Sequence, residues 1–565
     1  MRMRTGGVLE CSSVLMRSPL RGSVGSAPRR SPWRIAKARV PVFRTAGAPA
    51  AARVMFEKRA HRIPKTGMDP RRYRFLNCAI DTPTLAAGTM TATAHHSPET
   101  PPNQPDLVLD LASFAANIDT ARLDRNVVEA VKTNILDTLS CALAGSSAKA
   151  IAEVSGLVQE WAGTPQADMF VLGGKFPAHH AALINGGMSH ARDYDDTHDA
   201  AILHAGVTAV PAAIAAAQLR GGVSGSELIA AVAAGLEVTC RLGVGVKVDI
   251  VESGFIYTSL LGYFGATAAA GRALGLNDEQ MRNAFGIVYS SVAGNHQVTR
   301  DASLMKRLQP GLAAQAAVLA VQLAQRGIRG AQEVFDGADG FIRVYLQGRV
   351  DREVVRKDLG QRFELLNLSY KPYPCCRDTH SAIDAALELR AKTGRPASDI
   401  EAIRVGVTAP GYQMVCVPEA VRLAPRTIVE AQFSIPYTVA AAWIDGRMGI
   451  GHFSDEGLQR EDILALTTRV RPYVDADIER DWSRFVTPAR VVVEFRDGQT
   501  VETRIDYPKG HPRNPMLPAE FTAKTADCAT FAARALPADT AVRLTETVGR
   551  LESVADIAEL MRTIT

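Results

Sequence analysis

The sequence predicts a mainly α-helical protein, in which a large all-helical domain precedes a smaller α+β domain. From residue 107 to about residue 368, apolar residues recur every three or four positions, which is the period of a helix with one buried face. After Lys371 the pattern alternates as in strands, and Asp497-Gly498 separates two apolar runs, which is a strong hairpin signal. The length of 565 residues provides for more than one folded domain.

The N-terminal region differs from the rest of the chain in charge and composition. Residues 1–89 hold 18 Lys and Arg against four Asp and Glu, a net charge of +14, whereas the remaining residues have a net charge of −9. Because the region is rich in Arg, Ser, Pro and Ala and has no regular period, we expect residues 1–105 to form a disordered basic tail and linker. Two interpretations stay open: an organelle transit peptide, or an over-long start with the working chain beginning near Met68 or Met90.

The helical domain is expected to span residues 106–369. Within it, the segment 126–144 places its apolar residues on one face, and Gly145 stands where a glycine commonly ends a helix. Residues 277–280 resemble a capping box that begins another helix. Three further segments share the helical period and are rich in Ala and Leu: 226–242, 258–274 and 312–326. Since small residues let helices approach closely, we expect a buried multi-helix bundle.

The α+β domain is expected to span residues 370–510, and the C-terminal residues 511–565 are expected to return to the helical domain, making that domain discontinuous. Alternating apolar residues predict strands at 403–407, 490–495 and 501–505. Helical patterns occur at 379–393, 439–444 and 454–466, and again at 526–561 in the C-terminal segment.

Composition and motif content exclude or weaken several functional classes. The longest apolar run, 207–219, has 13 residues and contains Pro211, whereas a helix that spans a bilayer needs about 20. The eight Cys show no spacing typical of zinc or iron–sulfur ligands, and no P-loop or GxSxG motif is present. With an acidic body, we expect no nucleic-acid or membrane partner, no metal, and a cytoplasmic location unless the tail is a transit peptide.

The densest polar cluster lies between His190 and His204, where three His and four Asp stand within 15 residues. A metal site is disfavoured because the three His do not share one helical face. An acid–base site is favoured because the cluster holds spare groups to move a proton and to orient the group that does so. The alternative is a solvated loop whose Asp residues cap helices. The cluster leads directly into the apolar run 207–219, and this position at the mouth of a buried helix favours a functional role.

Three further motifs contain groups suited to a site for an anion. Lys306 precedes a helix expected to begin near Gly311, and the positive end of the helix dipole adds to its charge. Between Lys371 and Arg377, two prolines immobilise the backbone, which presets both charges for a carboxylate. Tyr437 brings a phenol to the start of an apolar helix in the α+β domain.

Taken together and in this order, the motifs resemble the MmgE/PrpD family, which includes 2-methylcitrate dehydratase, cis-aconitate decarboxylase and iminodisuccinate epimerase. The matching stretches are Asp193-Tyr-Asp-Asp-Thr197, His204-Ala-Gly206, residues 258–266, Met305-Lys306, residues 370–380 and residues 434–437. The resemblance covers roughly residues 107–560. It implies a large helical domain with a smaller α+β lid, a homodimer, and a site without metal or cofactor in the cleft between the domains.

The resemblance implies a role for each matching residue. Asp193, His204 and Tyr437 would be catalytic, and Thr197, Lys306, Lys371 and Arg377 would bind the carboxylates of the substrate. There is one departure: where decarboxylase-like members have a His after Gly-Phe or Gly-Trp, this chain has Ile256, which cannot move a proton. Tyr257 or His296 would take that role, and His380 is a further candidate site residue.

From these residues we expect a cofactor-independent lyase that removes a proton α to a carboxylate of a small di- or tricarboxylate, most like a 2-methylcitrate dehydratase. The cations would stabilise the negative charge that develops. His204 would act as the general acid/base, with Asp193 orienting it or taking the proton itself. The alternatives are a carboxy-lyase of the cis-aconitate decarboxylase type, an epimerase or isomerase of a dicarboxylate, and a non-catalytic carboxylate-binding protein.

Overall fold

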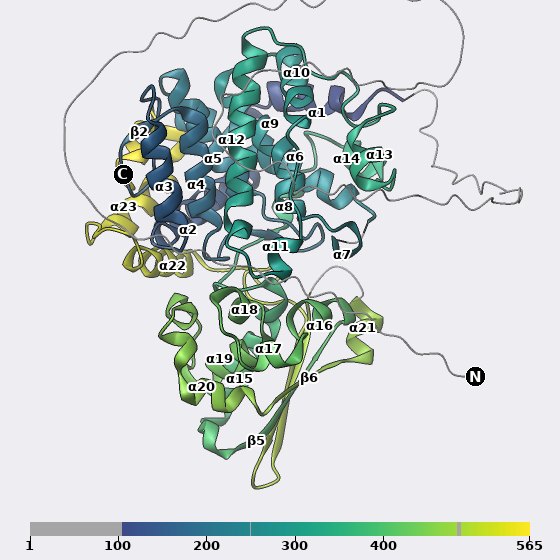
Figure 1. The fold of residues 1–565 in the computed structure, drawn as a ribbon, viewed down its shortest axis with the longest axis vertical. Coiled ribbons are helices and arrows are strands. Elements are labelled where there is room, and N and C mark those ends of the chain that lie inside the picture. Colours follow the sequence, from purple (N-terminus) through teal and green to yellow (C-terminus); the bar gives the residue numbers. More distant parts are fainter. Residues whose placement is uncertain (1–103, 249, 483–486) are drawn as a thin grey trace, which may run out of the picture. The chain divides into compact units, whose positions relative to one another are not determined.

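A computed structural model describes residues 104–565 except 249 and 483–486 (Figure 1). The tail predicted for residues 1–105 lies outside the described residues, apart from its last two positions. In the described part of the chain, helices predominate and strands are few, which confirms the mainly α fold with a smaller sheet-containing domain.

The helical body comprises the elements from α1 to α14. Its long helices are α1 (Leu107–Asn117), α2 (Arg125–Gly145), α3 (Ile151–Trp161), α4 (Ala178–His190), α5 (Gly206–Arg220), α6 (Gly225–Gly245), α9 (Gly262–Leu274), α10 (Asp278–Tyr289) and α12 (Met305–Gln325). Shorter helices join them: α7 (Ile250–Ser253), α8 (Tyr257–Leu260), α11 (Gln297–Arg300), α13 (Phe341–Leu346) and α14 (Arg352–Arg356). Two pairs of short antiparallel strands complete it: β1 (Ala167–Asp168) with β2 (Lys175–Phe176), and β3 (Thr197–His198) with β4 (Leu368–Ser369).

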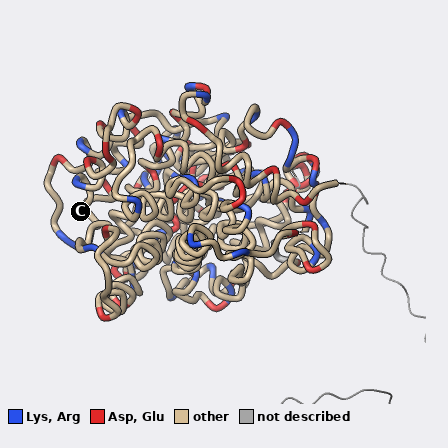
Figure 2. The backbone as a smooth tube through the Cα atoms, turned by 90° about the horizontal axis from the view of Figure 1, so that it is seen from above, with Lys and Arg blue, Asp and Glu red and all other residues tan. Residues whose placement is uncertain are grey.

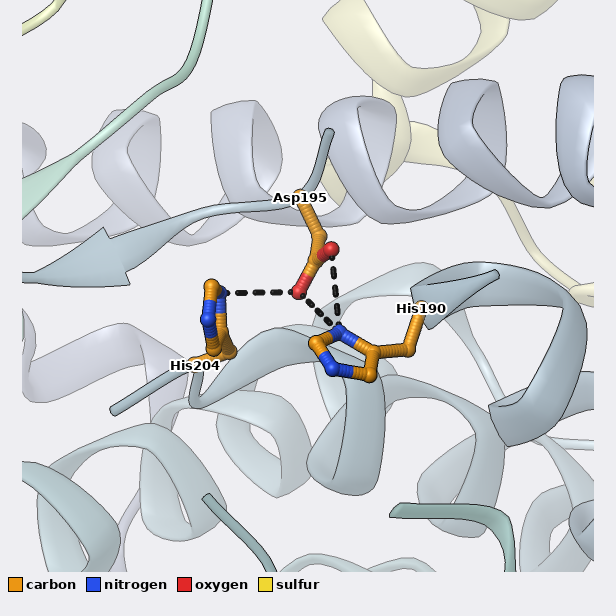
Figure 3. Close-up of side chains that lie close together, drawn as sticks. All are labelled: His190, Asp195 and His204. Carbon is orange, nitrogen blue, oxygen red and sulfur yellow. Dashed lines mark hydrogen bonds and ion pairs between the residues drawn. The ribbon is translucent and has the colours of Figure 1, made fainter. Parts of the chain in front are cut away.

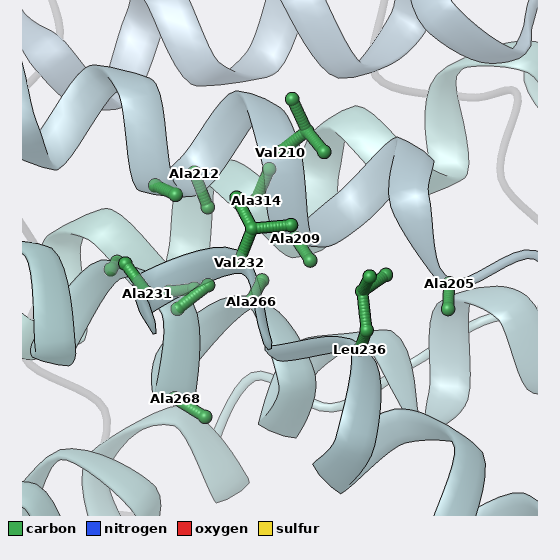
Figure 4. Close-up of a cluster of buried hydrophobic side chains, with 14 of the residues drawn as sticks. Ala205, Ala209, Val210, Ala212, Ala231, Val232, Leu236, Ala266, Ala268 and Ala314 are labelled. Carbon is green, nitrogen blue, oxygen red and sulfur yellow. The ribbon is translucent and has the colours of Figure 1, made fainter. Parts of the chain in front are cut away.

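Small side chains fill the centre of the helical body. Figure 4 shows Ala209 of α5, Val232 of α6, Ala266 of α9 and Ala314 of α12 in one cluster, and all four are fully buried. Because alanine and glycine add little bulk to a helix surface, the backbones of these helices come close together. The prediction of a tightly packed helical bundle is confirmed.

Gly311 of α12 lies against the backbone of α4. A Cβ atom at this position would lie 2.1 Å from the carbonyl oxygen of Leu183. We therefore expect Gly311→Ala to lower the free energy of unfolding by about 1–3 kcal/mol, the usual cost of overpacking. Gly156 in α3 is the matched control, because a Cβ there would meet nothing within 4 Å. Urea unfolding of both variants checks this, and equal stabilities would contradict it.

The structure corrects two details of the predicted helices. Gly145 ends α2 as expected, but it has helical backbone instead of the positive φ of many glycine caps, and a Cβ there would lie 1.8 Å from the carbonyl oxygen of Met188. Its lack of a side chain therefore serves helix packing. Lys306 was expected to precede its helix, but α12 already begins at Met305 and includes Pro310 in its second turn. The capping box at Asn277 is confirmed.

The sheet domain comprises the elements from α15 to β8. Its helices are α15 (His380–Thr393), α16 (Ala409–Val415), α17 (Glu419–Leu423), α18 (Ile428–Gln432), α19 (Ile435–Asp445), α20 (Glu461–Thr467) and α21 (Ala476–Trp482). Its strands are β5 (Ile400–Val407), β6 (Val470–Val474), β7 (Ala489–Phe495) and β8 (Thr500–Ile505). The strands lie in the order β6-β5-β7-β8, with β5 parallel to β6 and the other pairs antiparallel. The predicted hairpin joins β7 and β8, with Glu494 opposite Thr500.

The C-terminal helices contact the helical body. They are α22 (Pro518–Thr530), α23 (Thr540–Gly549) and α24 (Ala558–Met561), so the single helical pattern predicted at 526–561 is divided into shorter helices. Figure 1 shows α22 and α23, in yellow, beside α2. The hydroxyl groups of Ser140 in α2 and Thr525 in α22 lie 2.8 Å apart, and Cys528 belongs to the core of the helical body.

Hydropathy and charge follow the fold. Among the described residues, α6 alone is long and apolar enough to cross a membrane, and 94% of its most apolar window is buried inside the protein. Such burial is typical of a central helix in a protein core. Figure 2 shows basic and acidic residues interspersed along the described chain.

Candidate active site

A cavity of about 280 Å³ lies between the helical body and the sheet domain. The helical body contributes polar side chains to its wall: His190, Asp193, Thr197, His204, His296 and Lys306. The sheet domain contributes mainly apolar ones, Met414, Phe433 and Trp482 among them. Polar groups that converge on a cavity with apolar side chains in its wall are typical of a small-molecule site.

A short strand pair brings the two main motifs to this cavity. The Asp193 loop (residues 191–196) follows the end of α4 and enters β3, which pairs with β4, so that Thr197 lies opposite Ser369. Lys371 stands two residues after β4 and therefore lies beside the loop. Asp193 itself has a positive φ of 53°, a left-handed conformation that Asp tolerates better than most residues.

Two lysines share the carboxylate of Asp193. Its Oδ1 atom lies 3.1 Å from the Nζ atom of Lys306 and 3.2 Å from that of Lys371. Lys371 also donates to the backbone carbonyl of Asp193 at 3.1 Å. Burial alone would raise the pKa of Asp193, but the two cations hold it well below its usual range. Burial would lower the pKa of Lys371, but Asp193 raises it. The site therefore contains a buried anion with two cations.

A second buried carboxylate, Asp195, joins two histidines (Figure 3). Its Oδ2 atom lies 3.0 Å from the Nδ1 atom of His190 and 3.0 Å from that of His204. Burial would raise the pKa of Asp195, but the two histidines hold it well below its usual range. Burial and the Lys306 cation lower the pKa of His190 to about 4, although Asp195 raises it. His190 is therefore neutral at neutral pH, donates from Nδ1 to Asp195, and accepts at Nε2 from Lys306, 3.2 Å away.

The contacts of His204 fix which ring nitrogen can exchange a proton. Its Nδ1 atom lies 2.6 Å from the backbone carbonyl oxygen of Asp196, and a carbonyl oxygen can only accept a hydrogen bond. Nδ1 therefore carries the hydrogen, and Nε2 holds the lone pair of the neutral ring. The backbone N–H of His204 donates to the hydroxyl of Thr258 at 3.1 Å, which holds the residue in place. His204 lines the cavity, as expected for a general acid/base.

Asp196 holds the backbone that follows His204. Its carboxylate accepts the backbone N–H groups of Ala205 and Gly206, at 2.9 and 3.0 Å, at the start of α5. Burial and the neighbouring Asp195 raise its pKa to about 7. A Cβ atom at Gly206 would lie 2.5 Å from Asp196 Oδ1, so the close contact requires glycine.

The structure does not bring Tyr437 or His380 to the cavity wall. Tyr437 is fully buried in the core of the sheet domain, where its hydroxyl donates to the backbone carbonyl of His452 at 2.6 Å. Its hydroxyl therefore does not face this cavity. His380 is also fully buried, with Nε2 3.2 Å from the carbonyl oxygen of Cys375. Both side chains lie where core packing and backbone carbonyls hold them.

Arg377 lies at the cavity but is already paired. Its guanidinium contacts both carboxylate oxygens of Asp199, at 3.1 and 3.2 Å, and donates to the backbone carbonyl of Lys509 at 3.1 Å. Asp199 balances the charge of Arg377. The main role of Arg377 is therefore to hold the cavity wall in place, and it contributes little charge for binding an anion. Thr197, Tyr257 and His296 line the cavity as predicted, and the Tyr257 hydroxyl donates to the carbonyl of Val248 at 2.7 Å.

Sequence reasoning did not select His190, Asp195 or Asp196 as site residues. Their signal was present in the density of the polar cluster, but only the fold shows that His190, at the end of α4, turns towards Asp195. These two residues and His204 also place three ligand-type atoms within 4.8 Å of one another. Each His-to-Asp contact has the length of a hydrogen bond and pairs a ring nitrogen with a carboxylate oxygen, so the three groups satisfy one another.

The fold and cavity define a protein of two domains with Lys306, Lys371 and His204 around one cavity. Comparison with known proteins gives the family. The MmgE/PrpD N-terminal domain matches residues 109–353, and the MmgE/PrpD C-terminal domain matches residues 373–552. The chain therefore belongs to the MmgE/PrpD family, which confirms the resemblance seen in its motifs.

Similar proteins include cis-aconitate decarboxylases from fungi and mammals. A cis-aconitate decarboxylase-like protein of Aspergillus oryzae, oryM, is 26% identical over 480 residues, covering 81% of this chain and 97% of the relative. The cis-aconitate decarboxylase of Aspergillus terreus is 25% identical over 420 residues, covering 71% and 85%. The human cis-aconitate decarboxylase is 26% identical over 460 residues, covering 79% and 93%.

Proposed function

We propose that this protein is a lyase that acts on a small di- or tricarboxylate by proton transfer, and that its reaction is that of a carboxy-lyase of the cis-aconitate decarboxylase type. The observation that carries the proposal is the pair of lysines on Asp193 beside His204 in one cavity. The similar decarboxylases support the carboxy-lyase reaction over the dehydratase reaction that the sequence alone favoured.

The lysine pair is suited to bind a carboxylate. Two cations face one carboxylate, so the group keeps one excess positive charge. In the contacts described above, each lysine uses two of its three N–H donors. Lys306 donates to Asp193 and His190, and Lys371 donates twice to Asp193. The third donor of each lysine is therefore left for an oxygen of the substrate. A polycarboxylate bound in this way would be held with a carbon atom near His204.

The reaction then requires one proton and stabilisation of charge. Breaking the bond between carbon and the departing carboxylate releases CO₂ and leaves its electron pair on the remaining carbon skeleton. The neighbouring carboxylate, bound to the lysines, delocalises this charge, and protonated His204 delivers a proton to carbon from Nε2. Ionised Asp195 orients the His204 ring through its contact with Nδ1, and His190 holds Asp195 in place.

A second candidate function is a hydro-lyase of the 2-methylcitrate dehydratase type. It is favoured by Ile256, which lines the cavity at the position where decarboxylase-like members have a histidine. An elimination in which His204 takes a proton from carbon and returns it to the leaving hydroxyl group needs a single acid/base group. This reaction fits a cavity in which Ile256 cannot transfer a proton.

A substrate panel followed by NMR in D₂O distinguishes these reactions. The full chain, treated with a chelator, is incubated with cis-aconitate, citrate and 2-methylcitrate. We expect cis-aconitate to lose CO₂ at the same rate with and without chelation. The groups that could bind a metal, His190 and His204, are each hydrogen-bonded to Asp195. Loss of water from 2-methylcitrate would instead support the hydro-lyase. Deuterium exchange without loss of CO₂ or water would support an isomerase, and thermal stabilisation without any reaction would support a binding protein.

A further inference from the structure

Lys524 in α22 is a buried cation that belongs to none of the motifs recognised in the sequence. It is 4% exposed, and an ammonium group removed from water is stable only when all of its donors are bonded. Its Nζ atom donates to Asp137 Oδ1 at 2.6 Å, to the carbonyl oxygen of Tyr194 at 2.7 Å and to the carbonyl oxygen of Lys371 at 2.9 Å. The three acceptors match the three N–H groups of the ammonium.

The three acceptors belong to three separate parts of the chain. Asp137 lies on α2, Tyr194 lies in the Asp193 loop, and Lys371 follows β4. Two of the acceptors are thus the backbone of cavity residues or of their direct neighbours. On the cavity side, Lys371 Nζ and Asp193 Oδ1 lie 3.2 Å apart. Lys524 therefore makes a second connection between the Asp193 loop and the segment of Lys371, through their backbone carbonyls.

Tyr194 reinforces this junction. The Lys524 ammonium lies 4.1 Å from the centroid of the Tyr194 ring, and a cation is attracted to an aromatic face. The Tyr194 hydroxyl donates to the carbonyl oxygen of Pro372 at 3.1 Å, which adds a second tie between the Asp193 loop and the segment of Lys371. The left-handed backbone of Asp193, with φ of 53°, needs such external support.

We propose that Lys524 is a positioning residue for the active site: it sets the distance between the Asp193 loop and Lys371, and so makes the C-terminal helix α22 part of the catalytic machinery. The proposal rests on the proposed function for the roles of Asp193 and Lys371. Lys524 does not line the cavity, so it acts through the residues it holds. Burial would lower the pKa of Lys524, but Asp137 raises it, which keeps the ammonium charged.

The test compares Lys524→Met with a variant at a similar lysine. Lys132 is 5% exposed and lies on α2, where it pairs with Glu129 at 3.2 Å, and its ion pair with Glu552 at 3.0 Å joins α2 to the C-terminal region. Its ammonium bonds Glu129 and Glu552, neither of which belongs to the Asp193 loop, so Lys132→Met controls for the loss of a buried cation. Because Lys524→Met leaves the Asp137 carboxylate buried without its partner, the double variant Lys524→Met/Asp137→Asn is measured beside it.

We expect the double variant to fold and to show a kcat about 100-fold lower with little change in KM, because a displacement of about 1 Å is enough for such a loss. Lys132→Met is expected to keep the kcat and KM of the natural protein. Hydrogen exchange, measured without substrate, is expected to rise in residues 192–197 of the double variant and not in Lys132→Met. Natural kcat in the folded double variant would overturn the proposal.

The two proposals fail in different ways. If the natural protein turns over no polycarboxylate, the proposed function is wrong, and hydrogen exchange alone decides whether Lys524 positions the loop. Unchanged exchange of residues 192–197 in both Lys524→Met and the double variant would overturn the positioning role whatever the reaction is. If neither variant folds, exchange of the natural protein decides: protection of the Tyr194 segment no greater than that of exposed loops would also overturn it.

Discussion

Replacing His204 by Gln is expected to lower kcat by about 10²–10⁴-fold, the range that general acid–base catalysis supplies. Glutamine retains a donor for the carbonyl oxygen of Asp196, so the loop keeps its conformation, but an amide cannot exchange a proton near neutral pH. The measurement is kcat with cis-aconitate, or with whichever acid of the panel reacts, together with the melting temperature.

The control for this prediction is His179→Gln. His179 lies on α4, the helix that ends at His190, and it does not line the cavity. This variant should keep the kcat of the natural protein. If His204→Gln retains natural activity while binding substrate normally, His204 is not the acid/base, and the assignment of the site is wrong.

The second large effect is expected for Lys371→Met. Removing this cation takes away one carboxylate anchor and leaves Asp193 with Lys306 alone, so kcat/KM should fall by about 10²–10³-fold. Breaking a buried ion pair on one side also destabilises a protein, by about 3–5 kcal/mol. The measurements are kcat/KM and the free energy of unfolding in urea.

A double variant separates the two consequences of losing Lys371. Lys371→Met/Asp193→Asn removes both buried charges, so it should recover much of the lost stability while kcat/KM stays low. Lys149→Met is the control for removing a lysine, because its pair with Asp455 is exposed and contributes about 0–1 kcal/mol. Recovery of activity along with stability would show that Lys371 acts only in folding.

Local sequence patterns predicted the helices and turns that are determined by residues close together in the chain. The period of residues 126–144 predicted α2, and Asn277 with Gln280 predicted the start of α10, because both signals act within a few residues. The Asp497-Gly498 turn predicted the β7–β8 hairpin for the same reason. The start of α12 was missed: the helix was expected near Gly311, but it begins at Met305 and includes Pro310.

The site depends on contacts that local patterns do not encode. Lys371 and Asp193 are 178 positions apart, and Lys524 is 330 positions from Tyr194. The resemblance to a family brought Asp193, His204 and the lysines together correctly, since all of them line one cavity. The same resemblance misplaced Tyr437, because nothing in its own segment indicates that the carbonyl groups of His452 and Gly457 bind its hydroxyl.

The most direct test of the account is ¹H NMR of cis-aconitate incubated with the full chain in D₂O after chelation. The account predicts that CO₂ is lost and that the resulting dicarboxylate carries deuterium at the carbon that received the proton, at a rate that falls with His204→Gln. Unchanged cis-aconitate, with neither loss of CO₂ nor deuterium incorporation, in a folded protein at substrate concentrations that saturate binding would contradict it.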